Sequence, residues 1–135
     1  MPSGSDHKRL LIVDDEKTIA DSLVRIFSVV GYETRCAYSA EEARALLAAW
    51  APDLAILDVC LPLMNGIDLA ILLKAEYPDC RLVLFSGNSD TEELLQMALR
   101  RGHTFDLFAK PIHPTELLTW AAGQNTPLEP DAELT

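Results

Sequence analysis

Residues 10–16 read Leu-Leu-Ile-Val-Asp-Asp-Glu, a short apolar run that ends abruptly in three acidic side chains. Residues 54–58, Leu-Ala-Ile-Leu-Asp, repeat the pattern with a single acid. Such runs are typical of strands buried on both faces of a parallel sheet. If the two runs are neighbouring strands, their carboxyl ends meet at one edge of the sheet. Asp14, Asp15 and Asp58 would then share one small space.

This shared space limits the chemistry that the acids can support. Like charges so close together cannot all stay ionised without a neighbouring cation. Side chains that offer only oxygen ligands suit Mg²⁺. The pair Asp14 and Asp15 suits metal binding, whereas Asp58, alone at the end of its run, suits nucleophilic attack. The backbone carbonyl of Cys60 could supply a further ligand, because a thiol is a poor ligand for this ion.

Apolar runs of this kind recur along the chain and alternate with segments of helical spacing. We expect strands at residues 9–13, 33–37, 54–57, 81–85 and 104–109. Helical periodicity and end signals predict helices at about residues 16–30, 39–50, 66–77, 90–101 and 114–122. The alternation predicts an α/β fold, a doubly wound five-stranded parallel sheet with helices on both faces.

Two helix starts carry capping signals. Ser39 followed by Glu42 is a capping box for the second predicted helix. Ser89 or Asp90 is expected to cap the fourth. His113 stands near the start of the last helix, where we expect a weak cap or a surface position.

Ser86 and Lys110 fall at the ends of the fourth and fifth predicted strands. Ligands of open parallel sheets bind beyond the carboxyl ends of the strands, so both residues should join the acids. Lys110 brings a compact cation on a flexible stem, and Ser86 brings a hydroxyl donor. A metal ion and a lysine together can neutralise charge on a transferring phosphoryl group.

Each piece also has a simpler explanation. Asp14-Asp15-Glu16 alone could be a solvated helix N-terminus, because acids favour the first turn of a helix. Asp58 could merely terminate a strand, Ser86-Gly87 could be only a turn, and Lys110-Pro111 could be only a loop. Their joint position at strand ends favours a functional site.

Composition narrows the classes of partner. The chain has 135 residues, enough for one domain with one core, and 49% of them are hydrophobic. Its formal net charge of −10 argues against direct binding to nucleic acid or to an anionic membrane surface. A basic patch on another protein fits this charge better.

Cysteine usage and the termini bear on the compartment. Cys36, Cys60 and Cys80 are odd in number and lack CxxC spacing, so we expect reduced thiols in a cytoplasmic protein. Residues 1–7 have no apolar core of a signal peptide. No apolar stretch is long enough to cross a bilayer. Residues 1–7 and 123–135 are expected to be disordered tails. Residues 123–135 could alternatively be the stub of a linker.

Four segments, taken in order, resemble the receiver domain of bacterial two-component response regulators. They are Leu-Ile-Val-Asp-Asp-Glu at 11–16, Asp-Val-Cys-Leu-Pro-Leu-Met-Asn-Gly at 58–66, Ser86-Gly87 and Lys110-Pro111. The resemblance covers residues 8–122. It implies a flavodoxin-like sheet with strand order 2-1-3-4-5.

The resemblance also implies roles for the matching residues. Asp58 would be the phosphoacceptor, supplied by a histidine kinase, a phosphotransfer protein or a small phosphodonor. Asp15 would bind Mg²⁺ directly and Asp14 through water, and the Cys60 carbonyl would complete the protein ligands. Lys110 would contact the phosphoryl group, and its bond to Pro111 would be cis.

Ser86 would move toward the phosphate and report its presence to the face made by the fourth helix and the fifth strand, where an unknown downstream protein would respond. The domain would thus be a two-state switch. Such a domain assists its own phosphorylation and dephosphorylation but is not an ordinary turnover enzyme. Phosphorylation-dependent homodimerisation through residues 90–101 and 114–122 is an open alternative.

One position departs from the family pattern. Family members often carry Tyr or Phe three residues before the lysine, and this chain has Leu107 there. Phe108 is adjacent, but strand alternation points it to the opposite face, and Phe105 lies two residues further from the site. We expect output to depend on Ser86 and loop movement, or on repacking of Phe108.

Other functions remain as alternatives. A phosphatase with an Asp nucleophile would need a second Asp at position 60, which is Cys60. A flavin-binding protein of this sheet order would need a Ser/Thr/Gly-rich phosphate loop in place of Asp14-Asp15-Glu16. A receiver-like scaffold that never accepts phosphate, or a fragment of a longer regulator or hybrid kinase, also fits.

Overall fold

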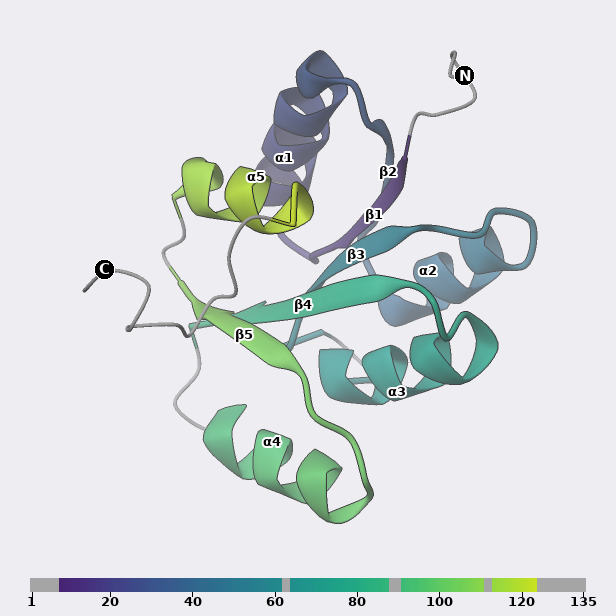
Figure 1. Ribbon diagram of the computed structural model, residues 1–135, viewed down its shortest axis with the longest axis vertical. Helices are drawn as coiled ribbons and strands as arrows, with labels where there is room; N and C mark the ends of the chain where they lie inside the picture. The colour runs from purple at the N-terminus through teal and green to yellow at the C-terminus, as the bar shows by residue number, and fades with distance from the viewer. Residues whose placement is uncertain (1–7, 62–63, 88–90, 111–112, 124–135) are drawn as a thin grey trace.

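The computed structural model describes residues 8–61, 64–87, 91–110 and 113–123, which form one sheet with helices on both sides (Figure 1). Its strands are β1 (Arg9–Val13), β2 (Glu33–Ala37), β3 (Leu54–Asp58), β4 (Arg81–Ser86) and β5 (Asp106–Ala109). Its helices are α1 (Lys17–Val30), α2 (Ala40–Leu47), α3 (Gly66–Glu76), α4 (Thr91–Arg100) and α5 (Pro114–Ala121). Strand and helix alternate throughout, as the sequence predicts.

The strands are parallel and lie in the order β2-β1-β3-β4-β5. This confirms the predicted doubly wound, flavodoxin-like sheet with its strand order 2-1-3-4-5. The registers bring the carboxyl ends of the strands to one edge: Val13 pairs with Leu57, Asp58 with Phe85, and Ser86 with Ala109.

Alternate strand residues feed two separate cores. Leu10, Ile12, Leu54, Ile56, Val83 and Phe85 pack under α1 and α5. Their neighbours Leu11, Val13, Ala55, Leu57, Leu82 and Leu84 pack under α2, α3 and α4. Figure 1 shows α1 and α5 on one side of the sheet and the other three helices across it. Because both faces are covered, the central strands β1, β3 and β4 are apolar between their first and last residues, which explains the continuous apolar runs. The edge strands β2 and β5 each carry an exposed charged residue, Arg35 and Asp106.

The predicted capping box at Ser39 forms, with one difference in detail. The Ser39 side chain accepts a hydrogen bond from the Glu42 amide at 3.1 Å, and the Glu42 carboxylate accepts one from the Tyr38 amide at 2.9 Å. A usual capping box would return that second bond to the Ser39 amide. At the end of α1, Gly31 has φ 117°, the left-handed conformation expected of a helix C′ residue.

Two element bounds differ from the sequence prediction by more than one residue. Helix α2 ends at Leu47, three residues early, because Trp50 turns away and its indole donates to Glu33 at 3.1 Å. Strand β5 begins at Asp106, two residues late, because the His103 amide still closes the end of α4 by donating to Ala98 at 2.9 Å.

Several predictions concern residues outside the described ranges. These are the tails at 1–7 and 124–135, the cap at Ser89 or Asp90, and the Lys110-Pro111 bond. Within the described ranges, no helix has the length and apolar character needed to cross a bilayer.

Candidate functional site

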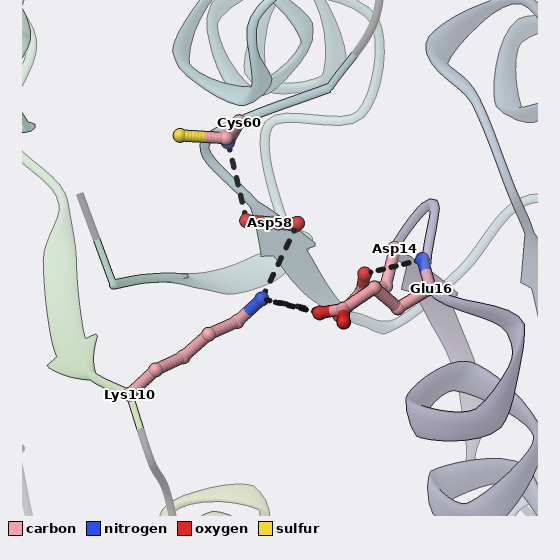
Figure 2. Close-up of polar contacts among 5 residues, drawn as sticks. All are labelled: Asp14, Glu16, Asp58, Cys60 and Lys110. Atoms are coloured by element: carbon pink, nitrogen blue, oxygen red, sulfur yellow. Dashed lines mark hydrogen bonds and ion pairs between the residues drawn. The ribbon is translucent and has the colours of Figure 1, made fainter.

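The carboxyl edge of the sheet carries a cluster of charged side chains. Asp14 follows β1, Asp58 ends β3, and Lys110 follows β5. Figure 2 shows the Lys110 side chain reaching across this edge toward both carboxylates. Asp58 continues the series Leu54 and Ile56, so it lies on the face covered by α1 and α5.

Asp14 is fully buried and only half satisfied. Its Oδ1 accepts a hydrogen bond from the Glu16 amide at 2.9 Å, while its Oδ2 accepts none from the described residues. Burial raises the pKa of Asp14 to about 6, and the nearby Asp58 charge raises it further against the lowering effect of the Glu16 amide and Lys110. A buried acceptor without a donor is costly, so this oxygen is available to a ligand.

Asp58 is 3% exposed, and both of its carboxylate oxygens have partners. Oδ1 accepts a hydrogen bond from the Cys60 amide at 3.1 Å, and Oδ2 lies 3.4 Å from Lys110 Nζ. Burial raises the pKa of Asp58, and this outweighs the lowering effect of the Cys60 amide and the Lys110 charge. The Cys60 backbone is therefore beside the carboxylate, as a ligand role for its carbonyl requires.

Lys110 holds the only ammonium group that contacts these acids within the described residues. Its Nζ lies 3.4 Å from Asp58, 3.6 Å from Asp14 and 3.6 Å from Glu16. Burial lowers the pKa of Lys110, but the charges of Asp58 and Asp14 outweigh burial, so the net shift is upward. The lysine therefore stays charged and partly neutralises the pocket.

Asp15 completes the acidic cluster from a more exposed position. One carboxylate oxygen from each of Asp14, Asp15 and Asp58 can be chosen so that all three lie within 4.8 Å of one another. Three carboxylate oxygens so placed fit a hard divalent cation, and Oδ2 of Asp14 accepts no hydrogen bond from the described residues that would compete for it. The sequence predicted that these three side chains come together, and the structure brings them together.

Ser86 and Leu107 lie on the other face of the sheet. Ser86 is buried at the end of β4, and its carbonyl accepts a hydrogen bond from the Lys110 amide at 3.0 Å. Leu107 and Phe105 pack against the core under α2, α3 and α4, whereas Phe108 packs against the core under α1 and α5. The expected alternation of Leu107 and Phe108 is confirmed.

Three contributors to the site have no role in the sequence analysis. Glu16 approaches Lys110, and the Phe85 ring lies beneath its ammonium group, with 4.8 Å from Nζ to the ring centroid. Gly66 donates to the Val59 carbonyl at 2.8 Å, and a Cβ there would collide with the Asp58 carbonyl oxygen. Gly66 ends the segment 58–66 that carries the family resemblance, and this was its signal in the sequence. Phe85 carries no sequence signal beyond an apolar strand.

The fold and this pocket define an α/β domain with an acidic, lysine-bearing site at the carboxyl edge of its sheet. The sequence profile described as response regulator receiver domain matches residues 10–122. The chain therefore belongs to the receiver domains of two-component response regulators.

Individual relatives agree with this assignment. The nitrogen assimilation regulatory protein NtrX of Azorhizobium caulinodans is 34% identical over 111 residues, which cover 81% of this chain and 24% of NtrX. The DNA-binding response regulator MtrA of Mycobacterium tuberculosis is 32% identical over 82% of this chain and 47% of MtrA. The chain thus spans less than half the length of either relative.

Solved structures show the same fold. A CheY-like response regulator receiver domain protein from Methanospirillum hungatei superposes with a TM-score of 0.79 at 30% identity, covering 88% of this chain and 94% of that protein. The receiver domain of NtrX from Brucella abortus superposes with a TM-score of 0.72 at 34% identity, covering 85% of this chain and 96% of that domain.

Proposed function

We propose that residues 8–122 act as a phosphorylation-activated switch in which Asp58 accepts a phosphoryl group. The observation that carries the proposal is the buried Asp58 carboxylate with Lys110 Nζ 3.4 Å away and two further carboxylates within metal-ligand range. Response regulators receive phosphoryl groups from histidine kinases, so a histidine kinase or phosphotransfer protein is the proposed donor. A small acyl phosphate is a second source.

In this proposal the acidic cluster holds Mg²⁺. Asp15, Asp58 and the Cys60 carbonyl would bind the ion directly, and Asp14 would bind it through water. When bound, the ion would neutralise charge on the phosphoryl oxygens and on the acids. Oδ2 of Asp14, which accepts no hydrogen bond from the described residues, supports this arrangement, because a metal-bound water could donate to it.

The chemical step needs little from the protein beyond position and charge. A carboxylate oxygen of Asp58 attacks phosphorus, and the bond from phosphorus to the donor breaks with its electron pair leaving on the donor. An aspartyl phosphate remains. Lys110, which already lies between Asp58 and Asp14, would turn to a phosphoryl oxygen, and the Ser86 hydroxyl would donate to another.

Dephosphorylation would follow the same geometry. Water attacks phosphorus, the bond between phosphorus and the Asp58 oxygen breaks, and inorganic phosphate leaves with the carboxylate restored. The domain would assist both steps as a switch, rather than act as a turnover enzyme. Ser86 movement would then alter the protein contacts made by the α4, β5 and α5 side.

Output partners are proposed only in kind. The net charge of −10 favours a basic protein surface over direct contact with nucleic acid. MtrA is described as DNA-binding, but less than half of it matches this chain, so the expectation of no direct nucleic-acid contact stays a prediction. Cytoplasmic location and phosphorylation-dependent dimerisation are likewise proposals.

Mass spectrometry tests the phosphoacceptor directly. With Mg²⁺ and a small acyl-phosphate donor, the chain should gain one phosphoryl mass, and Asp58→Asn should abolish the gain. Asp79→Asn is the matched control, because it makes the same change at an exposed turn after α3 and should leave the gain intact. An unmodified mass for the native chain would instead favour a receiver-like scaffold that never accepts phosphate.

A further inference from the structure

The contacts of the Lys110 ammonium with its acidic neighbours are long. Its distances of 3.4 Å to Asp58 and 3.6 Å to both Asp14 and Glu16 are longer than the roughly 2.7–2.9 Å of a strong charge-assisted hydrogen bond. Lysine is also a point charge on a flexible four-carbon stem. These long contacts leave room for a further contact to position the charge.

The Phe85 ring is the rigid feature beneath that charge. Lys110 Nζ lies over the ring, 4.8 Å from its centroid, within the roughly 6 Å range of a cation–π contact. Phe85 is 2% exposed and packs in the core under α1 and α5. Because the ring is buried in a central strand, it cannot move with the flexible lysine side chain. It therefore provides a fixed surface for the ammonium.

The same ring is tied to the backbone of the acceptor. Phe85 pairs with Asp58 in the register of β3 and β4, and its carbonyl accepts a hydrogen bond from the Val59 amide at 3.0 Å. The ring and the Asp58 carboxylate are therefore mounted on adjacent strands at one level.

We propose that Phe85 is a positioning residue, which holds the Lys110 ammonium beside Asp58 through the face of its ring. This inference rests on the proposed phosphoacceptor role of Asp58, which it deepens. A cation–π contact does not fix the direction in which the N–H groups of the ammonium point. Lys110 could therefore turn from the carboxylates to an arriving phosphoryl group while its ammonium stays over the ring. The ring would thereby keep the ammonium close to Asp58 in both the unphosphorylated and the phosphorylated protein.

Fluorinated phenylalanines at position 85 test this role with almost no change in shape. One, two and three fluorines progressively weaken the negative ring face that attracts a cation. We expect the rate of phosphoryl uptake from a small acyl phosphate with Mg²⁺ to fall stepwise, by about three- to tenfold for three fluorines. The same series at Phe27, a fully buried ring with no cation placed over it among the described residues, should leave the rate unchanged.

Nuclear magnetic resonance supplies a readout that does not need phosphorylation. The chain has four lysines, so Lys110 can be assigned by comparison with Lys110→Arg. Its ε-methylene protons should lose their ring-current shift in Phe85→Leu. Lys17, which lies over the Tyr38 ring at 5.0 Å, should keep its own shift and serves as the internal control.

The outcomes separate the two proposals. Equal uptake rates across the fluorinated series, or unchanged Lys110 resonances in Phe85→Leu, would overturn the positioning role and leave the phosphoacceptor proposal standing. If the native chain takes up no phosphoryl group, the phosphoacceptor proposal fails, and the Lys110 resonances alone decide whether the ring holds the lysine.

Discussion

At the scale of single residues, the site joins groups that are unfavourable when considered alone. Asp14 is a buried carboxylate, one oxygen of which accepts no hydrogen bond from the described residues, and Asp58 is a second buried carboxylate close by. Lys110 offsets their charge only in part. This arrangement makes an unfavourable electrostatic contribution to the stability of the metal-free protein. A bound cation, or a phosphoryl group with its metal ion, could reduce that contribution.

The raised pKa of Asp14 makes this unfavourable contribution to stability depend on pH. Its pKa is about 6 in the folded state against an ordinary value of 3.8, so the folded protein binds this proton more tightly. The contribution of Asp14 is therefore most favourable below pH 3.8 and is lost as the pH rises toward and past 6. A shift of this size corresponds to about 3 kcal/mol as an upper bound.

Asp14→Asn should remove that loss, because a neutral amide can still accept from the Glu16 amide. We expect the metal-free variant to be about 1–3 kcal/mol more stable than the native chain at pH 7. Urea unfolding at pH 5, 6, 7 and 8 with a chelator present measures the difference. If the unfolding free energies of the two proteins change with pH in the same way, the buried Asp14 carboxylate is not the source of the destabilisation.

At the scale of the elements, the turn between β3 and α3 holds the acceptor through a close backbone contact. Gly66 begins α3 and donates to the Val59 carbonyl at 2.8 Å, and any Cβ at this position would meet the Asp58 carbonyl oxygen. The helix and the acceptor strand can therefore approach so closely only with glycine at this position.

Gly66→Ala should displace either α3 or the Asp58 backbone. We expect a loss of about 2–4 kcal/mol in unfolding free energy, together with slower phosphoryl uptake. Gly87→Ala is the control, because its new Cβ would make only an ordinary 3.5 Å contact, and it should change stability by less than about 0.5 kcal/mol. Similar stabilities for the two variants in urea would refute the close-contact argument.

The N-terminus of α5 offers a second test at this scale. His113 caps the helix, with its Nδ1 accepting from the Thr115 amide at 3.3 Å, a long bond that agrees with the expectation of a weak cap. His113→Ser should raise the unfolding free energy by about 0.5–1 kcal/mol, because serine is a preferred N-cap residue. Thermal unfolding at pH 7 would measure the gain, and a lower midpoint for the variant would contradict it.

At the scale of the whole molecule, local pattern predicted a parallel sheet with helices on both faces, and the family resemblance supplied its strand order. Continuous apolar runs alternating with helical spacing permit few arrangements, and the carboxyl ends of parallel strands meet wherever the order is β2-β1-β3-β4-β5. That is why Asp14, Asp15 and Asp58 could be brought together from sequence. The family resemblance then supplied roles that no pattern of charges could assign.

Contacts between distant segments could not be predicted from the sequence. The Phe85 ring meets Lys110 because β4 and β5 pair in one particular register, and the Gly66 contact depends on the path of a loop. The ends of α2 and β5 also shifted, since the Trp50 indole and the His103 amide found partners in other elements. These features follow from packing, which periodicity does not encode.

A crystal structure of the chain with Mg²⁺ and beryllofluoride would test the central claim most directly. The account predicts beryllofluoride on an Asp58 oxygen, a metal ion ligated by Asp15, Asp58 and the Cys60 carbonyl, and Lys110 Nζ turned to a fluorine while still over the Phe85 ring. Asp58 without beryllofluoride, in a pocket with no metal beside Asp15, would contradict it.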